Sequence, residues 1–498
     1  MLAAAEDVFQ PEVILMIFAG NALGMLVGAL PGLTATMGMA LFSPWTFFMP
    51  PTIAIPFVIG IYKGGTYGGS ISAILIGTPG TASNAATVMD GYPMAKKGLG
   101  GKALKAAIYT STLGDFVGNI ALILVAGFLA QVALSFGPPE FFALILFSMT
   151  VIASLTSTSL VKGFLAASLG ALLALVGADP VSGALRYTFG SVELQGGVSF
   201  IPLMIGLFGF SEVLVTLLRP RSERPAVVKL KGDRDANRIT LGEIFRYPRT
   251  VIRSCLVGLG LGALPGIGAE SACWVSYAMA KRASPEPEKF GTGCLEGLIA
   301  PEVANNAVVG AALIPLLTFG VPGDAVTAVM LGTFTAQGLQ PGPLLFRDHP
   351  EVIYGLYVTM FVAGMVMIVT ASLTIRFWVK VLEIPREYLY PIISVLCVVG
   401  SFAINNSLFD VGLMLVAGLG GFVLRMGGFA IPPMVLAFIL TPKLELALQQ
   451  SLVMSDGGYS IFVSRPISAF FMVLTAISIA LFVRRDLRQG SAQRRPTT

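Results

Sequence analysis

Apolar stretches long enough to cross a bilayer recur along nearly the whole of this chain. Roughly twelve to fourteen of them lie between Pro11 and Val483, at about 20 residues per span, and some are short or interrupted by Gly or Pro. Only 12% of the 498 residues are charged, about half the share typical of a soluble domain. Such a chain could not hydrate the surface of a soluble globule. The pattern predicts an all-α, polytopic membrane protein.

The two halves of the chain share short motifs. Four segments recur in the same order: 28–33 as 262–267, 74–80 as 317–323, 140–142 as 387–389, and 196–199 as 457–460. Small residues at every fourth position precede the first motif in each half, and such ridges let helices approach closely in lipid. The repetition predicts two structurally repeated halves, one covering residues 1–218 and the other residues 249–484.

Basic residues are concentrated outside the apolar stretches. Residues 219–248 form a basic linker, which the positive-inside rule assigns to the cytoplasm, and residues 485–498 form a basic tail that we expect to be disordered. The linker is either a solvated connector or a patch that binds lipid or a partner. Other basic loops fall at opposite positions in the two halves, which favours inverted repeats. Because linker and tail both look cytoplasmic, one half needs an extra crossing, or one apparent span is re-entrant.

Each half contains two Pro-Gly pairs: Pro31-Gly32 and Pro79-Gly80 in the first, Pro265-Gly266 and Pro322-Gly323 in the second. Proline removes a backbone donor and glycine relaxes the backbone, so we expect broken or re-entrant helices at mid-membrane. Non-helical backbone at that depth survives only where protein or a water-filled cavity covers it. A broken helix offers N–H groups and a positive dipole end, which suit an anion. The alternative is that these pairs merely kink helices for packing.

Small polar side chains surround the breaks. For substrate binding we predict the four Pro-Gly pairs together with Thr34, Thr36, Lys63, Thr78, Thr81, Ser83, Asn84 and Ser271. For a sodium ion we predict Asn305, Asn306, Asp324 and Thr327. Lys63 could instead extend to the membrane interface. Ionisable residues within apolar segments are functional candidates by default, so Asp115, Glu270 and Glu302 could bind cations, relay protons or pair structurally.

Enzyme motifs are missing from the sequence. It has no G-x-S-x-G elbow, no Walker lysine and no His/Cys metal cluster, and its four cysteines show no C-x-x-C spacing. The formal net charge of +5 arises from basic residues gathered in a few loops, as in membrane proteins. We therefore expect no enzyme, no cofactor apart from Na⁺ or H⁺ as coupling ion, and no nucleic-acid partner.

Several segments carry a family resemblance. They are 28–41, 67–98, 136–144, 263–270, 300–323, 338–346, 405–415 and 464–471. With these segments the chain resembles the large membrane subunit, the TctA type, of tripartite tricarboxylate transporters. The resemblance implies cation-driven secondary uptake of tricarboxylates or related carboxylates across the bacterial inner membrane. It also implies two protein partners, a small membrane subunit and a periplasmic solute-binding protein.

The sequence and the resemblance together predict a secondary transporter. We expect alternating access, with the substrate site near mid-membrane at the interface of the two repeats. Two alternatives stay open: a transporter of other organic acids, dicarboxylic or aromatic, in the same kind of system, or an uncoupled channel.

Overall fold

The computed structural model describes all residues except 1–5, 156–158, 219–226, 229–236, 385 and 494–498. Helices dominate the described residues, which also include one two-stranded sheet. Nine helices among them are long and apolar enough to cross a membrane. The prediction of an all-helical, polytopic membrane protein is confirmed at this level.

The first half of the chain is helical apart from one short hairpin, where the structure describes it. Its elements are α2 (Pro11–Ala29), α3 (Ala35–Phe42), η1 (Ser43–Phe48), α4 (Pro51–Leu75), η2 (Ala82–Asn84), α5 (Thr87–Met94), η3 (Ala95–Leu99), α6 (Gly100–Ala133), α7 (Pro138–Leu155), α8 (Leu160–Ala174), β1 (Gly177–Ala178), β2 (Leu185–Arg186), α9 (Phe200–Met204), η4 (Ile205–Phe210) and α10 (Ser211–Leu218). Most of the predicted basic linker follows α10 and lies outside the described residues.

The second half is again helical in its described part. Its elements are α11 (Leu241–Ile244), α12 (Pro248–Gly262), α13 (Gly268–Ala283), η5 (Pro287–Lys289), α14 (Leu295–Phe319), α15 (Ala325–Ala336), α16 (Pro343–Asp348), α17 (Pro350–Val381), α18 (Arg386–Asn405), α19 (Leu408–Met426), α20 (Ile431–Met454), α21 (Ile461–Ser464) and α22 (Pro466–Gln493). The predicted C-terminal tail begins inside α22, and residues 494–498 lie outside the described part.

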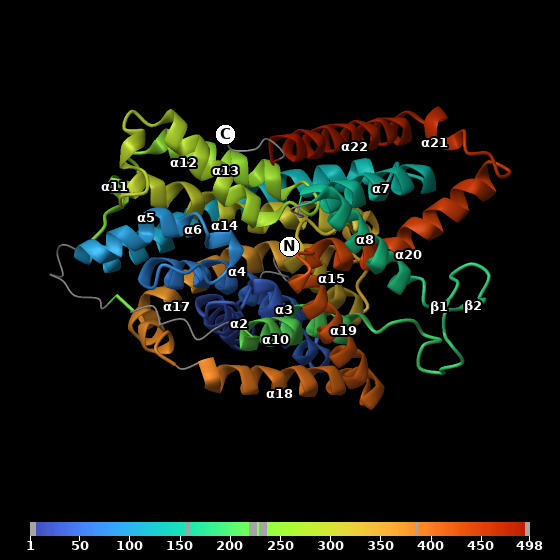
Figure 1. Ribbon diagram of the computed structural model, residues 1–498, viewed down its shortest axis with the longest axis horizontal. Helices are drawn as coiled ribbons and strands as arrows, with labels where there is room; N and C mark the ends of the chain where they lie inside the picture. Colours follow the sequence, from blue (N-terminus) through green and yellow to red (C-terminus); the bar gives the residue numbers. More distant parts are fainter. Residues whose placement is uncertain (1–5, 156–158, 219–226, 229–236, 385, 494–498) are drawn as a thin grey trace.

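Two helices, α4 and α14, form the centre of the molecule. Figure 1 shows them between α22 along one edge and α18 along the opposite edge. All residues of α4 from Ala54 to Leu75 are buried, as are those of α14 from Gly297 to Thr318. Their polar side chains must therefore find partners inside the protein.

Small residues bring α2 against α4. A Cβ added to Gly24 would overlap the carbonyl oxygen of Ile61, and one added to Gly28 would overlap that of Gly65. The two helices advance in the same direction, because four residues along α2 correspond to four along α4. This close backbone contact explains the glycine ridge seen in the sequence.

Helix α12 approaches α14 in the same manner. A Cβ on Gly258 would overlap the carbonyl oxygen of Ala304, and one on Gly262 would lie 3.0 Å from the Cα of Val308. Gly258 and Gly262 are the glycines that the sequence repeat aligns with Gly24 and Gly28. In both halves, glycines spaced four residues apart thus pack against a buried central helix.

Helix α6 runs beside α14 in the same direction. Cβ atoms on Gly114 and Gly118 would meet the carbonyl oxygens of Val303 and Ala307, respectively. Both helices therefore begin at one face of the molecule and end at the other.

Helix α4 runs opposite to α6 and α14. Lys63, near its middle, pairs with Asp115 of α6. Further along α4, Ser70 donates to Glu302 of α14, which also accepts from Ser111 of α6. Ser111 precedes Asp115 in α6, whereas Ser70 follows Lys63 in α4. Because the contacts move backwards along α6, the two central helices α4 and α14 are antiparallel.

The start of α6 marks one face of the molecule by its charge. We call this the basic face, defined by Lys96, Lys97, Lys102 and Lys105. Lys102 pairs with Glu243 of α11 there. Helix α6 has 34 residues and spans about 51 Å, so Ala133 at its end lies at the opposite, far face.

The strands β1 and β2 form a small hairpin between α8 and α9. Arg186 of β2 contacts Glu445 of α20 at 2.6 Å and Asp179 at 3.2 Å. Backbone N–H groups of Ser182 and Val181 lower the pKa of Asp179 to about 2. The aspartate is therefore ionised at neutral pH, and the hairpin is attached to α20 through Arg186.

Candidate functional site

Each of the four Pro-Gly pairs lies between two helices. The first separates α2 from α3, and its Gly32 has a φ of 93°. The equivalent pair separates α12 from α13, and its Gly266 has a φ of 80°. Because L side chains rarely adopt such positive φ angles, glycine is needed at both positions.

The other two pairs follow the central helices. A glycine with a φ of 68°, Gly77, comes after α4, and Gly320, with a φ of 67°, caps α14. Gly77 and Gly320 occupy the same place in the repeated motif, three residues before the glycine of Pro79-Gly80 or Pro322-Gly323. The chain leaves each central helix by the same left-handed turn.

Breaks within one half touch one another. The N–H of Gly266 donates to the carbonyl oxygen of Gly323 at 2.7 Å. In the first half, a Cβ on Gly80 would overlap the carbonyl oxygen of Gly28, and the N–H of Gly80 donates to the carbonyl oxygen of Gly69 at 3.3 Å. Breaks that are distant in sequence are thus packed backbone to backbone.

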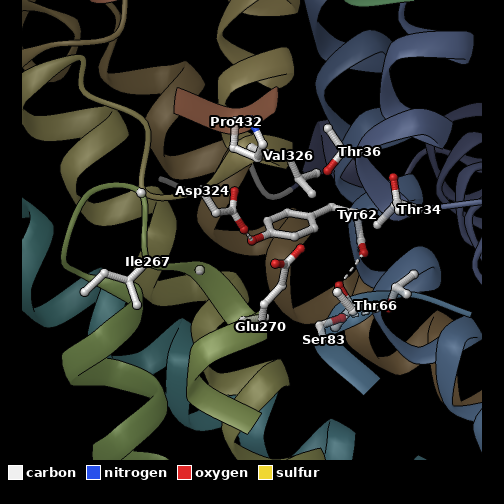
Figure 2. Close-up of a pocket in the computed structure, with 17 residues that line it drawn as sticks. Thr34, Thr36, Tyr62, Thr66, Ser83, Ile267, Glu270, Asp324, Val326 and Pro432 are labelled. Atoms are coloured by element: carbon white, nitrogen blue, oxygen red, sulfur yellow. Dashed lines mark hydrogen bonds between the residues drawn. The ribbon is translucent and has the colours of Figure 1, made fainter. Parts of the chain in front are cut away.

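All four broken segments contribute to one pocket of about 70 Å³. Figure 2 shows residues from both halves of the chain converging on it. The pocket is lined by Thr34, Ala35, Thr36, Tyr62, Thr66, Thr81, Ala82, Ser83, Gly266, Ile267, Gly268, Ala269, Glu270, Asp324, Ala325, Val326 and Pro432. Helices α3 and α15 begin at this pocket, so their N-terminal N–H groups lie beside it.

Asp324 is held in place by both halves. Its Oδ1 accepts hydrogen bonds from the N–H of Thr327 at 2.7 Å and from the Thr327 hydroxyl at 2.8 Å, which caps α15. Its Oδ2 accepts a hydrogen bond from the Tyr62 hydroxyl of α4 at 2.5 Å. Figure 2 shows this contact at the centre of the pocket.

Glu270 of α13 faces the same pocket without a recorded partner for its carboxylate among the described residues. The pocket therefore contains two carboxylates, and none of the described residues lining it is Lys or Arg. Nor does the described part of the chain contain a cluster of three or more His, Cys, Asp or Glu side chains for a metal ion. The chemistry of the pocket is that of hydroxyls, backbone groups and two acids.

A second carboxylate system lies behind the pocket. Glu302 of α14 is fully buried and accepts hydrogen bonds from the hydroxyls of Ser70 (2.7 Å), Thr87 (2.5 Å) and Ser111 (2.8 Å). These three hydroxyls come from α4, α5 and α6. The network therefore joins α14 to three helices of the first half.

A chain of side chains connects this network to the pocket. The Asn84 amide donates to Ser70 at 2.6 Å, and its oxygen accepts from the hydroxyls of Thr81 and Ser83. Thr81 and Ser83 line the pocket. Asn305 of α14 donates to the carbonyl oxygen of Ser83 at 3.1 Å.

These contacts are reciprocal between the halves. Tyr62 stands 18 positions before Gly80, and Asn305 stands 18 positions before Gly323. Tyr62 of α4 contacts the break after α14 at Asp324, while Asn305 of α14 contacts the break after α4 at Ser83. Each central helix thus supports the break that follows the other.

Lys63 lies outside the pocket. Its ammonium forms a buried ion pair with Asp115 and also reaches Asn119 at 3.5 Å. Asn119 in turn donates to Asp115 at 3.1 Å and to the Met360 carbonyl oxygen at 3.2 Å. The pair joins α4, α6 and α17.

The structure brings together some of the predicted site residues. Those that line the pocket are Thr34, Thr36, Thr81, Ser83, Gly266 and Asp324. The predicted residues that do not line it are Pro31, Gly32, Lys63, Thr78, Pro79, Gly80, Asn84, Pro265, Ser271, Asn305, Asn306, Pro322, Gly323 and Thr327. Asn306 donates to the Asn305 side-chain oxygen at 2.6 Å.

Three polar pocket residues were missing from the predicted substrate and sodium sites: Tyr62, Thr66 and Glu270. The repeat offered a signal for two of them. Glu270 stands eight positions after Gly262, as Thr36 does after Gly28, and Tyr62 is equivalent to Asn305. Glu270 was already predicted from its charge as a possible cation-binding residue, and aligning the halves residue by residue would have placed Tyr62 at the site as well.

Comparison with known proteins gives one family and two relatives. A family model described as the tripartite tricarboxylate transporter TctA family matches residues 14–436. An uncharacterized 52.8 kDa protein in the TAR-I ttuC′ 3′ region of Agrobacterium vitis is 39% identical over 479 residues, which cover 96% of this chain and 94% of that protein. An uncharacterized protein in the TAR-II ttuC′ 3′ region of the same organism is 36% identical over 233 residues, 47% of this chain and 96% of that protein. No solved structure matches the chain.

Proposed function

Because this chain belongs to the TctA family of tripartite tricarboxylate transporters, we propose that it is the permease subunit of a binding-protein-dependent importer. Its substrates are tricarboxylates such as citrate, or related carboxylates, and it resides in the bacterial inner membrane. A small membrane subunit and a periplasmic solute-binding protein complete the system. The family is one of transporter subunits, and the chain is not an enzyme.

The observation that carries this proposal is the pocket at which all four Pro-Gly breaks meet. The N-termini of α3 and α15 supply backbone N–H groups and positive dipole ends to a substrate carboxylate. The hydroxyls of Thr34 and Thr36 supply further donors, whereas those of Thr81 and Ser83 line the pocket but already donate to Asn84. Such a site binds an anion without a buried lysine or arginine, as the broken helices of other transporters do.

The two acids of the pocket support cation coupling. Glu270 and Asp324 repel an incoming carboxylate unless a cation accompanies it or a proton neutralises them. A sodium ion bound by Asp324 and Thr327 removes this repulsion, so substrate and ion bind together. Asn305 and Asn306 contribute to a second ion-binding region, beside the break that follows α4. This dependence is the basis of symport.

Inverted repeats account for the pairing of the two halves. Equivalent glycines pack on α4 and α14 with the same spacing, and these two helices are antiparallel. The reciprocal contacts of Tyr62 and Asn305 support a substrate site at the interface of the repeats. Alternating access follows when one repeat moves against the other around this pocket. The basic face is cytoplasmic by the positive-inside rule, and the far face is periplasmic.

Uptake by the reconstituted system tests the proposal. The chain, the small membrane subunit and the binding protein are placed in proteoliposomes, and uptake of radiolabelled citrate is measured with and without an inward Na⁺ gradient. We expect accumulation that requires the gradient and disappears when it is collapsed. Absence of uptake for every di- and tricarboxylate that shifts the melting temperature of the binding protein would contradict the proposal.

The same assay separates the alternatives. An uncoupled channel would equilibrate citrate without accumulating it, whatever the Na⁺ gradient. A system for dicarboxylic or aromatic acids would show Na⁺-driven uptake of those acids and none of citrate. An inward proton gradient replaces Na⁺ if H⁺ is the coupling ion.

A further inference from the structure

Lys443 of α20 faces two large cavities that share no lining residue with the pocket. Their volumes are about 650 Å³ and about 550 Å³, and Gln340 and Pro341 also line both of them. Small-molecule sites generally occupy about 300–1,000 Å³. We call the two cavities together the vestibule.

The vestibule lies toward the far face of the molecule. Ala133, at the end of α6, lines the larger cavity, as does Pro138 at the start of α7. Pro432, near the beginning of α20, lines the pocket, and Lys443 follows eleven positions later. Along a helix this separation is about 16 Å, so the vestibule is displaced from the pocket toward the far face.

The ammonium of Lys443 has spare hydrogen-bonding capacity. Its one recorded polar contact in the described part of the chain is the carbonyl oxygen of Gly320, at 3.0 Å. An ammonium has three donors, so two remain available to the vestibule. Lys63, by contrast, is paired with Asp115. An acid does occur at the edge of the larger cavity, but this residue, Asp348, is paired with Arg347 at 2.8 Å.

Capping of α14 explains only part of this arrangement. A lysine near a helix C-terminus stabilises the last carbonyl groups, and Gly320 terminates α14. That role uses one donor and requires no cavity on either side. A lysine within a membrane protein usually pairs with an acid or extends to the interface. Lys443 has no acidic partner within the described residues, and the amide side chains of Gln340 and Asn405 line the vestibule beside it.

We propose that Lys443 is the receiving residue for substrate carboxylates in the vestibule, occupied before the substrate enters the pocket. The inference rests on the proposed function, because it takes the substrate to be a carboxylate arriving at the far face. It adds a second binding position, with a positive side chain, to a pocket that has none among its described residues.

One short segment of the chain lies between Lys443 in the vestibule and the pocket. Gly320 to Asp324 joins α14 to α15, with Lys443 bound at its first residue and Tyr62 bound at its last. A carboxylate bound by the two free donors of Lys443 therefore lies beside the segment that joins the vestibule to the pocket.

Charge-selective labelling of a single introduced cysteine tests the inference without knowledge of the substrate. Gln340→Cys places a thiol in the vestibule, and its reaction rates with anionic, cationic and neutral methanethiosulfonates are measured in membrane vesicles of known orientation. One nearby positive charge enriches anions by about tenfold. The same charge depletes cations by about tenfold, so we expect the anionic-to-cationic rate ratio to fall by about a hundredfold when Lys443→Gln is added.

Controls separate charge from folding. Lys443→Arg should preserve the ratio, and the neutral reagent should react equally fast in all variants. Lys162→Gln is the matched control, because Lys162 also donates to a backbone carbonyl, that of Gly427 at 2.7 Å, but lines neither cavity. The chain with only its native cysteines gives the background. An unchanged ratio in Lys443→Gln at an unchanged neutral rate would overturn the inference.

Transport measurements then connect the residue to the substrate. Lys443→Gln should raise the KM for citrate about tenfold with a smaller change in maximal rate, and citrate should protect the introduced thiol of Gln340→Cys only when Lys443 is present. If the unmodified chain transports no carboxylate while the labelling ratio still depends on Lys443, the proposed function fails and the anion-attracting vestibule stands. Normal uptake with an unaltered KM in Lys443→Gln would remove Lys443 from the substrate path.

Discussion

At the scale of single residues, Glu270 and Asp324 differ in how their charges are satisfied. Asp324 accepts hydrogen bonds from Tyr62 and Thr327, whereas Glu270 faces the pocket without a recorded partner in the described residues. An unpartnered carboxylate is therefore the group most available to a cation. The two acids should contribute differently to ion binding.

Glu270→Gln should lower the affinity for the coupling ion more than it lowers the stability of the fold. The change keeps the shape of the side chain and removes the charge, so we expect the Na⁺ concentration for half-maximal citrate uptake to rise about tenfold or more, equivalent to about 1.4 kcal/mol. Sodium titrations of uptake measure this directly. Glu288→Gln, in η5 on the surface, is the control and should leave the titration unchanged. An unaltered sodium titration in Glu270→Gln would exclude Glu270 from the ion site.

The buried pair of Lys63 and Asp115 leads to a prediction about stability. Lys63→Met leaves the Asp115 charge buried and unpaired, which typically costs about 3–5 kcal/mol. The melting temperature of the purified protein in detergent should fall sharply. Adding Asp115→Leu should recover most of the loss, because the charge is then removed as well. A double variant that folds and transports normally would show that Lys63 does not bind substrate.

The residues of the site could be predicted unevenly from sequence. Thr34, Thr81 and Ser83 lie next to the Pro-Gly pairs, so local pattern alone placed them at the pocket. Tyr62 could not be placed this way, because its hydrogen bond to Asp324 spans 262 positions and depends on how α4 packs against the break after α14. Lys63 was predicted from its charge, but its surroundings depend on which side of α4 meets α6.

At the scale of helices, α12 offers a matched test of close packing. Gly258 approaches the Ala304 carbonyl, whereas a Cβ on Gly260 would have nothing within 4 Å. Gly258→Ala should lower the free energy of unfolding by about 1–3 kcal/mol through overpacking. Gly260→Ala should be neutral or raise it by about 0.5–1 kcal/mol, since alanine favours the helix. Thermal melting in detergent compares the two, and equal effects would argue against the close contact of α12 and α14.

The break at Pro79-Gly80 should be sensitive to any side chain. A Cβ on Gly80 would overlap the Gly28 carbonyl oxygen, so Gly80→Leu must displace one break from the other. We expect membrane insertion to persist and citrate uptake to be lost. Gly127→Leu on α6 has open space at its Cβ and serves as the control. Retained uptake in correctly inserted Gly80→Leu protein would separate this break from the transport site.

Helix boundaries could be predicted from the sequence where Pro and Gly interrupt the apolar stretches. The four Pro-Gly pairs and their small neighbours located four interruptions between helices. The status of α4 was harder to judge, because it contains Lys63 and many glycines and is not one of the nine described helices with a clear membrane-spanning composition. The burial of α4 depends on the helices that pack around it, and these contacts cannot be inferred from a local sequence pattern.

At the scale of the whole molecule, the two faces can be distinguished by labelling. Ser284 follows α13 and donates to Glu296 at the start of α14, which begins with α6 at the basic face. Ser182 lies in the hairpin that Arg186 attaches to Glu445, two residues after Lys443 of the vestibule. When an impermeant thiol reagent is applied to intact spheroplasts, we expect the Ser182→Cys variant to be labelled at once. The Ser284→Cys variant should be labelled only after permeabilisation. The reverse result would invert the assignment of the basic face to the cytoplasm.

The direction of the final helix, α22, indicates on which side of the membrane the C-terminus lies. Arg465 pairs with Glu140 at 2.9 Å, and Ser468 donates to the Pro139 carbonyl oxygen, so α22 begins beside the start of α7. Pro138 lines the vestibule at the far face, and α22 therefore leads back toward the basic face. A cytoplasmic linker and a cytoplasmic C-terminus are compatible if the second half crosses the membrane once more than the first.

The burial of α4 has a consequence for biosynthesis. Between Pro56 and Ser72 this helix carries a lysine and several Gly, Ser and Thr residues, so it gains little from lipid on its own. Its ionic partner Asp115 is synthesised 52 residues after Lys63, and Glu302, which accepts from Ser70, follows 232 residues after that serine. We therefore expect α4 to stay beside α2 or at the translocation machinery until α6 and α14 have been synthesised, and to reach its final place only when the second half arrives.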